Sequence, residues 1–233
     1  MIQINVLASG SKGNCYHITD GQTPLLLEAG IYWKNIQRGL GFQVDIQGCL
    51  VTHEHKDHSK AVNEVAKAGI DVYMTEGTVK ATGASGHRIR QIKAGNQFAI
   101  GTWAVLPFKT EHDCAEPVGY LLGNGKDKLL FATDTFYLRY CFNGLNYILI
   151  ECNYSEDILK ANVEAGIVPV DLKNRIIKSH FGLANVKEFL KANDLSRVQE
   201  IYLIHLSDGN SDADRFKREI QGLTGKPVYV AGA

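Results

Sequence analysis

The segment 53–58 reads HEHKDH and places four potential metal ligands within six residues. Imidazole nitrogens and carboxylate oxygens are suitable ligands for Zn²⁺, Fe²⁺ and Mn²⁺. His53 and His55 lie two positions apart and can point together, whereas Asp57 and His58 would turn away in the first turn of a following helix. The pattern therefore predicts one loop that serves two adjacent metal ions.

One loop cannot complete two coordination shells, so further ligands must come from elsewhere in the chain. Four later residues are candidates because each follows an apolar run, as an active-site residue at the end of a strand would. They are His112, Asp134, His180 and His205. A single histidine or aspartate at a strand end is usually a turn or cap residue. Together with the segment 53–58, however, these four favour a metal site.

The elements that position these residues are short strands and helices separated by glycines. Strands are predicted at 2–8, 15–19, 24–28, 48–52, 71–74, 88–93, 97–100, 103–108, 118–122, 128–133, 147–151, 200–205 and 227–230. Helices are predicted at 31–40, 57–68, 75–82, 155–164, 183–192 and 212–222. The middle of the chain lacks the regular strand–helix alternation of a doubly wound sheet. We therefore expect an α/β fold with two sheets and helices outside them.

The composition limits the class of protein. The chain carries 25 Lys+Arg and 25 Asp+Glu, so a nucleic acid would have to be held by local basic patches rather than by net charge. Its length of 233 residues and its 45% hydrophobic content predict one domain over residues 1–233. The five cysteines form no C-x-x-C pair, and neither a secretion signal nor a membrane span is visible. We expect a cytoplasmic protein with reduced thiols and no membrane partner.

Seven stretches of the chain carry a resemblance to a known family. They are LASGSKGNCY, LLEAG, VTHEHKDHSKAV, EHDCAEPVGY, FATDT, SHFGLAN and HLSDGNSD. The H-x-H-x-D-H pattern, and the order of the later His, Asp and His, resemble the metallo-β-lactamase superfamily of metallohydrolases over nearly the whole chain. Within it, the stretches look like the bacterial YycJ/WalJ-type branch, regarded as DNA exonuclease-like. The resemblance implies an α/β (α+β) fold, a four-layer αββα sandwich of two mixed sheets with the metals in a groove at one edge.

The resemblance also implies roles for single residues. One metal ion would be held by His53, His55 and His112, a second by Asp57, His58 and His205, and Asp134 would bridge both. His180 would lie near the substrate. Glu28 stands where the family usually has aspartate, and it would support the metal loop. Two divalent ions are implied, with Zn²⁺ as the first choice and Mn²⁺ or Fe²⁺ as alternatives.

Such a pair of ions predicts hydrolysis. Two ions about 3.5–4 Å apart lower the pKa of a bridging water to near ~7, and the resulting hydroxide can attack phosphorus or a carbonyl carbon. Asp57 could orient this hydroxide, and His180 could donate a proton to the leaving oxygen or hold a phosphate. We therefore expect a dinuclear metal-dependent phosphodiesterase or nuclease, exonuclease-like, that acts on DNA.

Contacts to the phosphate backbone would come from polar and basic groups outside the ligand set. The candidates are Ser9, Ser11, Lys12, Asn14, Arg88, Arg90, Arg175 and Lys178. A tight turn at 9–14 and solvated surface elsewhere are the alternatives for these residues.

Two other functions stay open on the sequence. A hydrolase of a small ester, lactone, thioester or cyclic phosphodiester would suit the zero net charge. The other alternative is a catalytically inactive metal- or partner-binding domain. The presence of all seven expected metal ligands argues against it, because such a domain would not need them. A redox di-iron role is disfavoured because that branch usually carries glutamate where His55 stands. The interval between Asp134 and His205 is too short for the inserted domain of the β-CASP nucleases.

Overall fold

The computed structural model describes residues 1–232, which divide into two compact units. The first unit comprises residues 1–109 and 114–127 together with Gly232, and the second comprises residues 110–113 and 128–231. Each unit therefore draws on segments that are separated in the sequence. The predicted single domain over residues 1–233, whose last residue lies outside the described part, stays a prediction.

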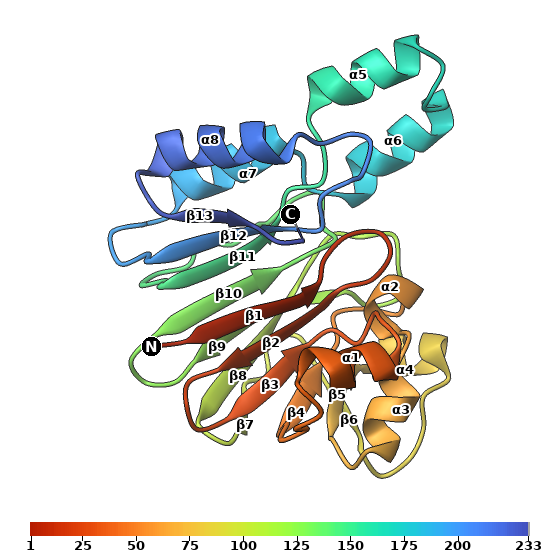
Figure 1. The fold of residues 1–233 in the computed structure, drawn as a ribbon, viewed down its shortest axis with the longest axis vertical. Coiled ribbons are helices and arrows are strands. Elements are labelled where there is room, and N and C mark those ends of the chain that lie inside the picture. The colour runs from red at the N-terminus through yellow and green to blue at the C-terminus, as the bar shows by residue number, and fades with distance from the viewer. Residues whose placement is uncertain (233) are drawn as a thin grey trace. The chain divides into compact units, whose positions relative to one another are not determined.

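A six-stranded mixed sheet forms the centre of the first unit (Figure 1). Its strands follow chain order and are β1 (Gln3–Ala8), β2 (Cys15–Thr19), β3 (Pro24–Leu27), β4 (Gly48–Leu50), β5 (Val72–Thr75) and β6 (Ile89–Ile92). The first three strands pair antiparallel, and β3 to β6 pair parallel. Strands β2 and β3 form a hairpin. Asp20 Oδ1 holds its turn by accepting hydrogen bonds from the backbone N–H groups of Gln22 and Thr23.

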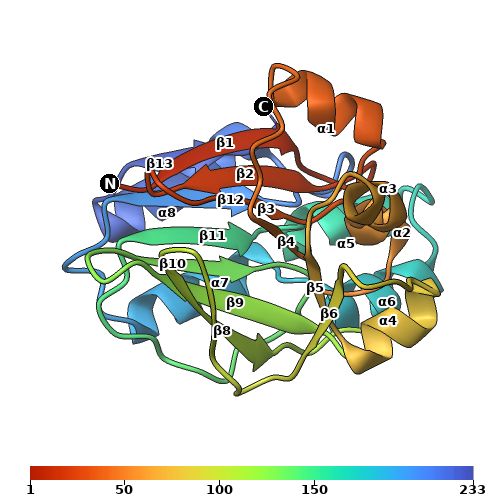
Figure 2. The same ribbon diagram turned by 90° about the horizontal axis from the view of Figure 1, so that it is seen from below.

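Four short helices accompany this sheet: α1 (Trp33–Gly39), α2 (Lys56–Ser59), α3 (Val62–Lys67) and α4 (Glu76–Thr82). Helix α3 contacts β5, and α4 contacts β5 and β6 and lies beside β6 in Figure 2. Buried apolar side chains from the helices and the sheet, among them Leu26, Val51 and Val65, form one core. The unit also contains the antiparallel strands β7 (Phe98–Ile100), β8 (Trp103–Lys109) and β9 (Val118–Gly123).

Parallel strands form the centre of the second unit. They are β10 (Lys128–Ala132), β11 (Tyr147–Glu151), β12 (Glu200–Ile204) and β13 (Val228–Val230). Every residue of β11 is buried, which is typical of a parallel strand with a nearly continuous apolar sequence. The helices are α5 (Glu156–Glu164), α6 (Val170–Ser179), α7 (Leu183–Ala192) and α8 (Ala213–Thr224). Figure 1 shows α7 and α8 together beside β12 and β13, and α5 and α6 as a separate pair.

The predicted helix over 57–68 is wrong as one element, because it is interrupted between α2 and α3. The carbonyl oxygens of Asp57 and His58 accept hydrogen bonds from the N–H groups of Asn14 and Ala29 instead of from the next helical turn. The Ala61 N–H in turn donates to Ala29 O over 2.8 Å. These bonds to neighbouring segments replace the i→i−4 bonds that a continuous helix would need.

Helix α6 was not predicted. Its apolar residues Val170, Leu172 and Ile177 are exposed by 38–59%, and the buried residue of this helix is Ser179. All other predicted strands and helices are present within a few residues of their expected ends. The five cysteines are free thiols. Among residues 1–232 no helix combines the length and apolar character needed to cross a membrane.

Candidate metal centre

Three candidate residues at strand ends have a left-handed backbone. Glu28 follows β3 with φ 67°, Asp134 follows β10 with φ 44°, and His205 follows β12 with φ 53°. Residues other than glycine rarely adopt this conformation, which costs about 1–3 kcal/mol and persists only where surrounding contacts enforce it. Such strain often gathers at functional sites, and three of the four non-glycine residues with this conformation among residues 1–232 are candidates from the sequence.

In the first unit, the histidines of segment 53–58 converge. His53 Nε2 lies 3.1 Å from His55 Nδ1, and the rings of His53 and His58 have centroids 4.2 Å apart. The other nitrogen of His53, Nδ1, is 2.9 Å from Thr52 Oγ1. His58 Nε2 is 3.4 Å from Asp57 Oδ2. Metal-binding histidines have this arrangement, with one ring nitrogen held by a supporting group and the other directed at the ion.

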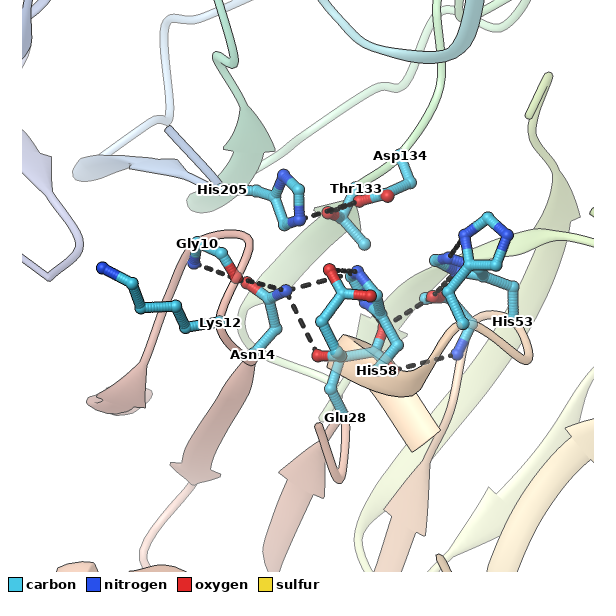
Figure 3. Close-up of polar contacts among 12 residues, drawn as sticks. Gly10, Lys12, Asn14, Glu28, His53, His58, Thr133, Asp134 and His205 are labelled. Atoms are coloured by element: carbon cyan, nitrogen blue, oxygen red, sulfur yellow. Dashed lines mark hydrogen bonds and ion pairs between the residues drawn. The ribbon is translucent and has the colours of Figure 1, made fainter. Parts of the chain in front are cut away.

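Glu28 lies against this loop (Figure 3). Its fully buried carboxylate accepts hydrogen bonds from Thr52 Oγ1 over 2.6 Å and from Thr52 N over 3.2 Å. It also lies 3.5 Å from His58 Nδ1. Burial raises the pKa of Glu28, although its contacts with His58 and Thr52 act in the opposite direction. The longer side chain of Glu28 thus connects the supports of two candidate ligands, His53 and His58.

Asn14 is a second support in the first unit. It has no exposed surface, and Figure 3 shows its amide between Gly10 and His58. Asn14 Nδ2 lies 3.2 Å from His58 Nε2 and donates to Gly10 O over 3.1 Å. Asn14 Oδ1 accepts from Gly10 N over 2.9 Å. The substrate contact expected for Asn14 is therefore replaced by a structural role, because the side chain is directed into the protein.

In the second unit, the two carboxylate oxygens of Asp134 face different histidines. Oδ2 lies 3.5 Å from His112 Nε2, and Oδ1 lies 3.7 Å from His205 Nε2. These separations exceed ordinary hydrogen bonds. Two ligands about 2.1 Å from one tetrahedral ion lie about 3.4 Å apart. His112 Nδ1 is held 2.8 Å from Ser179 O, and Thr133 Oγ1 donates to Asp134 Oδ1 over 2.7 Å. The donor set thus fits divalent metal ions.

Glu151 is a site residue that sequence reasoning missed. Its fully buried carboxylate ends β11, 2.7 Å from His180 Nδ1 and 3.3 Å from His205 Nδ1. It accepts hydrogen bonds from the N–H groups of Thr135 and Phe181, both over 3.1 Å. Burial would raise the pKa of Glu151, but His180 and the hydrogen bonds outweigh this and lower it. The signal was present in the sequence: a carboxylate closes the otherwise apolar strand YILIE.

His180 joins the same cluster. Ligand atoms of Asp134, Glu151, His180 and His205 all lie within 4.8 Å of one another. Burial lowers the pKa of His180, but the carboxylate of Glu151 outweighs it, so that the pKa is raised above its ordinary value. The residue before α7 is Gly182, and the imidazole of His180 contacts Glu151 instead of capping that helix.

The remaining substrate candidates have different surroundings. Ser11 and Lys12 are exposed in the loop after β1, where Ser9 Oγ lies 2.8 Å from Tyr16 OH. Arg175 and Lys178 are exposed on α6. The phosphate contacts expected for Arg88 and Arg90 do not fit the structure, because both guanidinium groups bind the Asp71 carboxylate over 3.0 and 2.9 Å. Arg88, just before β6, and Arg90, within β6, therefore share one carboxylate partner.

Comparison with known proteins decides the family. The profile described as "Beta-lactamase superfamily domain" matches residues 36–206. The chain belongs to this superfamily. It is 32% identical over 230 residues to "Exodeoxyribonuclease YycJ" of Bacillus anthracis, with 90% of this chain and 84% of that protein covered. It is 29% identical over 225 residues to "Exodeoxyribonuclease WalJ" of Streptococcus pneumoniae, with 89% and 82% covered. The resemblance found in the sequence is thereby confirmed.

A solved structure supports the same fold. The metallo-beta-lactamase fold protein YhfI from Bacillus subtilis matches with a TM-score of 0.74 at 13% identity, covering 99% of this chain and 97% of that one. The predicted metallo-β-lactamase fold is confirmed, with strands and helices in mixed α/β order. As a member of this superfamily with its histidine and carboxylate clusters, the chain is a metal-dependent hydrolase.

Proposed function

We propose that this hydrolase is a phosphodiesterase that acts on DNA as an exonuclease. The observation that carries the proposal is the pair of Asp134 oxygens, each facing a different histidine Nε2, which suits a carboxylate shared by two ions. Many enzymes that hydrolyse phosphodiesters use two metal ions, because the pair stabilises charge on both the attacking and the leaving oxygen. The relatives from B. anthracis and S. pneumoniae, both called exodeoxyribonucleases, support DNA as the substrate.

The ligand assignment in this proposal rests on residue type and on the order of the residues along the chain. One ion is assigned to His53, His55, His112 and Asp134, and the other to Asp57, His58, His205 and Asp134. These sets of histidine nitrogens and carboxylate oxygens suit Zn²⁺ first and Mn²⁺ or Fe²⁺ next. Bound divalent ions would supply a water of lowered pKa and neutralise phosphate charge.

The side chains have their own tasks in this mechanism. Glu151 accepts a hydrogen bond from the N–H group at His180 Nδ1 and favours the charged imidazolium, whose Nε2 proton would be donated to the leaving oxygen. Asp57 orients the attacking water. Glu28 keeps His58 in place through its Nδ1. Lys12, Arg175 and Lys178, all exposed, remain candidates for backbone phosphates. A cytoplasmic location is part of the proposal and agrees with five free thiols.

The test is hydrolysis by protein reconstituted with Zn²⁺, Mn²⁺ or Fe²⁺. End-labelled single-stranded and duplex DNA, RNA and a panel of lactones and thioesters are offered in parallel. We expect metal-dependent release of nucleotides from one DNA end and no turnover after chelation. Turnover of lactones or thioesters without DNA cleavage under any of the metals would favour the small-molecule hydrolase instead.

A further inference from the structure

An exposed aromatic ring next to two lysines lies in the first unit, just before α1. Tyr32 keeps 62% of its surface exposed. Lys60 Nζ lies 5.2 Å from the centre of its ring, and Lys34 Nζ lies 6.0 Å from it. We call Tyr32, Lys34 and Lys60 the Tyr32 patch. An aromatic ring and ammonium groups together provide the two kinds of contact that a nucleic acid strand needs.

Core packing does not explain the position of Tyr32. Its neighbours Ile31 and Trp33 pack against the core of the first unit, and Ile36 is fully buried in it. Tyr32 lies between Ile31 and Trp33 in the sequence and is directed away from that core. Its backbone oxygen accepts hydrogen bonds from the N–H groups of Asn35 and Ile36. The backbone at Tyr32 is thus fixed by the start of α1, while the ring is presented to solvent.

Within the described part of the chain, the ammonium groups of Lys34 and Lys60 are not neutralised by a carboxylate. Among the ion pairs of residues 1–232, none includes Lys34 or Lys60. By contrast, Arg88 and Arg90 of the same unit are both committed to Asp71. Lys60 Nζ donates one hydrogen bond to the backbone oxygen of Lys12 over 3.3 Å. An ammonium group has three donors, so this bond leaves capacity for an anion.

The patch is joined to the loop that carries the first-unit histidines. Lys60 lies two residues after His58, and Gly30 precedes Tyr32 by the same interval. Gly30 N donates to Asn14 O over 2.9 Å, and Asn14 N donates to Asp57 O over 2.7 Å. A Cβ atom at Gly30 would lie 1.6 Å from Asp57 O, which shows how closely the two segments are packed. A strand bound at Tyr32 would therefore run beside segment 53–58.

We propose that the Tyr32 patch binds the single-stranded part of a DNA substrate. One base stacks on the Tyr32 ring, and the adjoining phosphates contact the ammonium groups of Lys34 and Lys60. Stacking of a base on an aromatic ring is stronger than an exposed lysine–ring contact, so the base displaces a lysine towards the phosphate. The inference deepens the proposed function and rests on it, because it assigns the substrate a single-stranded segment next to the metal loop.

The experiment is fluorescence anisotropy with labelled, phosphorothioate-linked oligodeoxythymidylate, which resists cleavage by the metal-loaded full chain. Tyr32→Ala should weaken binding about 5- to 100-fold, as expected for the loss of one stacked base. Tyr32→Phe keeps the ring and should stay within about twofold of wild type. Phe42→Ala is the matched control, because Phe42 is an exposed aromatic residue of the same unit, 72% exposed, and lies outside the patch.

Salt dependence tests the lysines separately. Lys34→Ala and Lys60→Ala should each flatten the log–log salt slope of binding by about 0.7, whereas Lys126→Ala, in an exposed turn, should not. Blunt duplex should lose less affinity than the single strand in Tyr32→Ala. The inference is overturned if Tyr32→Ala binds the oligonucleotide as Phe42→Ala does, or if the patch variants lose affinity only for phosphatidylserine vesicles.

Hydrolysis of bis(p-nitrophenyl) phosphate by the metal-loaded wild-type chain separates the two ideas. If the wild-type protein binds the oligonucleotide through Tyr32 but cleaves no phosphodiester, the proposed binding patch is supported and the proposed nuclease activity is refuted. If the wild-type protein cleaves DNA and Tyr32→Ala binds the oligonucleotide as tightly as wild type, the proposed patch is refuted and the proposed nuclease activity is supported.

Discussion

The two histidine clusters are built in different ways. In the first unit, the histidines are neighbours in the sequence, and their supports Thr52, Glu28 and Asn14 reach them from nearby strand ends and loops. In the second unit, single residues from separate segments meet around two buried carboxylates, Asp134 and Glu151. A contiguous motif depends on the packing of its backbone, whereas a dispersed cluster depends on buried charge. Substitutions can test that difference.

The largest effect is expected for Asp134→Ala. Loss of the carboxylate that faces both His112 and His205 should lower hydrolysis by more than about 100-fold, because the carboxylate that we propose to be shared by two ions is removed. Metal content and single-turnover rate are the measurements. Asp194→Ala is the control, since Asp194 lies on the surface of the same unit. Activity within about tenfold of wild type at full metal occupancy would contradict a shared carboxylate.

Gly30→Ala should break the first cluster through its backbone. The added Cβ would meet Asp57 O at 1.6 Å, so unfolding free energy should fall by about 3 kcal/mol or more. Gly222→Ala is the control within α8, where nothing lies within 4 Å of the new Cβ. That change should stabilise the protein by about 0.5–1 kcal/mol. Urea titration measures both variants, and equal stability of the two would show that the loop is not held by this packing.

Glu151→Gln tests the buried charge of the second cluster. The amide keeps the shape but cannot accept from His180 and His205 as a carboxylate does, so activity or metal affinity should fall about 10- to 100-fold with the fold retained. Glu188→Gln, on the exposed side of α7, is the matched control. Circular dichroism checks the fold. A Glu151→Gln variant with wild-type activity and metal content would reduce Glu151 to a packing residue.

The smallest effect is expected outside both clusters, at Asp71→Asn. Burial would raise the pKa of Asp71, but hydrogen bonds from Arg88 and Arg90 outweigh it and lower the pKa. A depressed pKa in the folded state gives stability that is present above the unfolded pKa, about 3.9, and is lost as pH falls through the folded value. The arginines are 41% and 50% exposed, so less than about 1 kcal/mol is expected. Urea titrations of wild type and Asp71→Asn should therefore show a larger difference in unfolding free energy at neutral pH than near pH 3. A difference that is larger near pH 3 would contradict the lowered pKa of Asp71.

The amino-acid sequence alone determined the local features of this protein. Apolar runs and glycines placed nearly all strands and helices, and the segment 53–58 together with His112, Asp134, His180 and His205 identified the candidate ligands. These signals are local, because periodicity and turn residues reflect whether each short segment is buried and where it ends. The supporting role expected for Glu28 came from the family resemblance, in which aspartate usually stands at this position.

Tertiary structure alone decided which partner each polar group has. Four features depend on residues that are distant in the sequence. They are the interruption between α2 and α3, the internal role of Asn14, the pairing of Arg88 and Arg90 with Asp71, and the contact of Glu151 with two histidines. A one-dimensional pattern shows that a carboxylate ends a buried strand. It does not show which histidine will neutralise that carboxylate, because buried charges find their partners only when separate segments pack together.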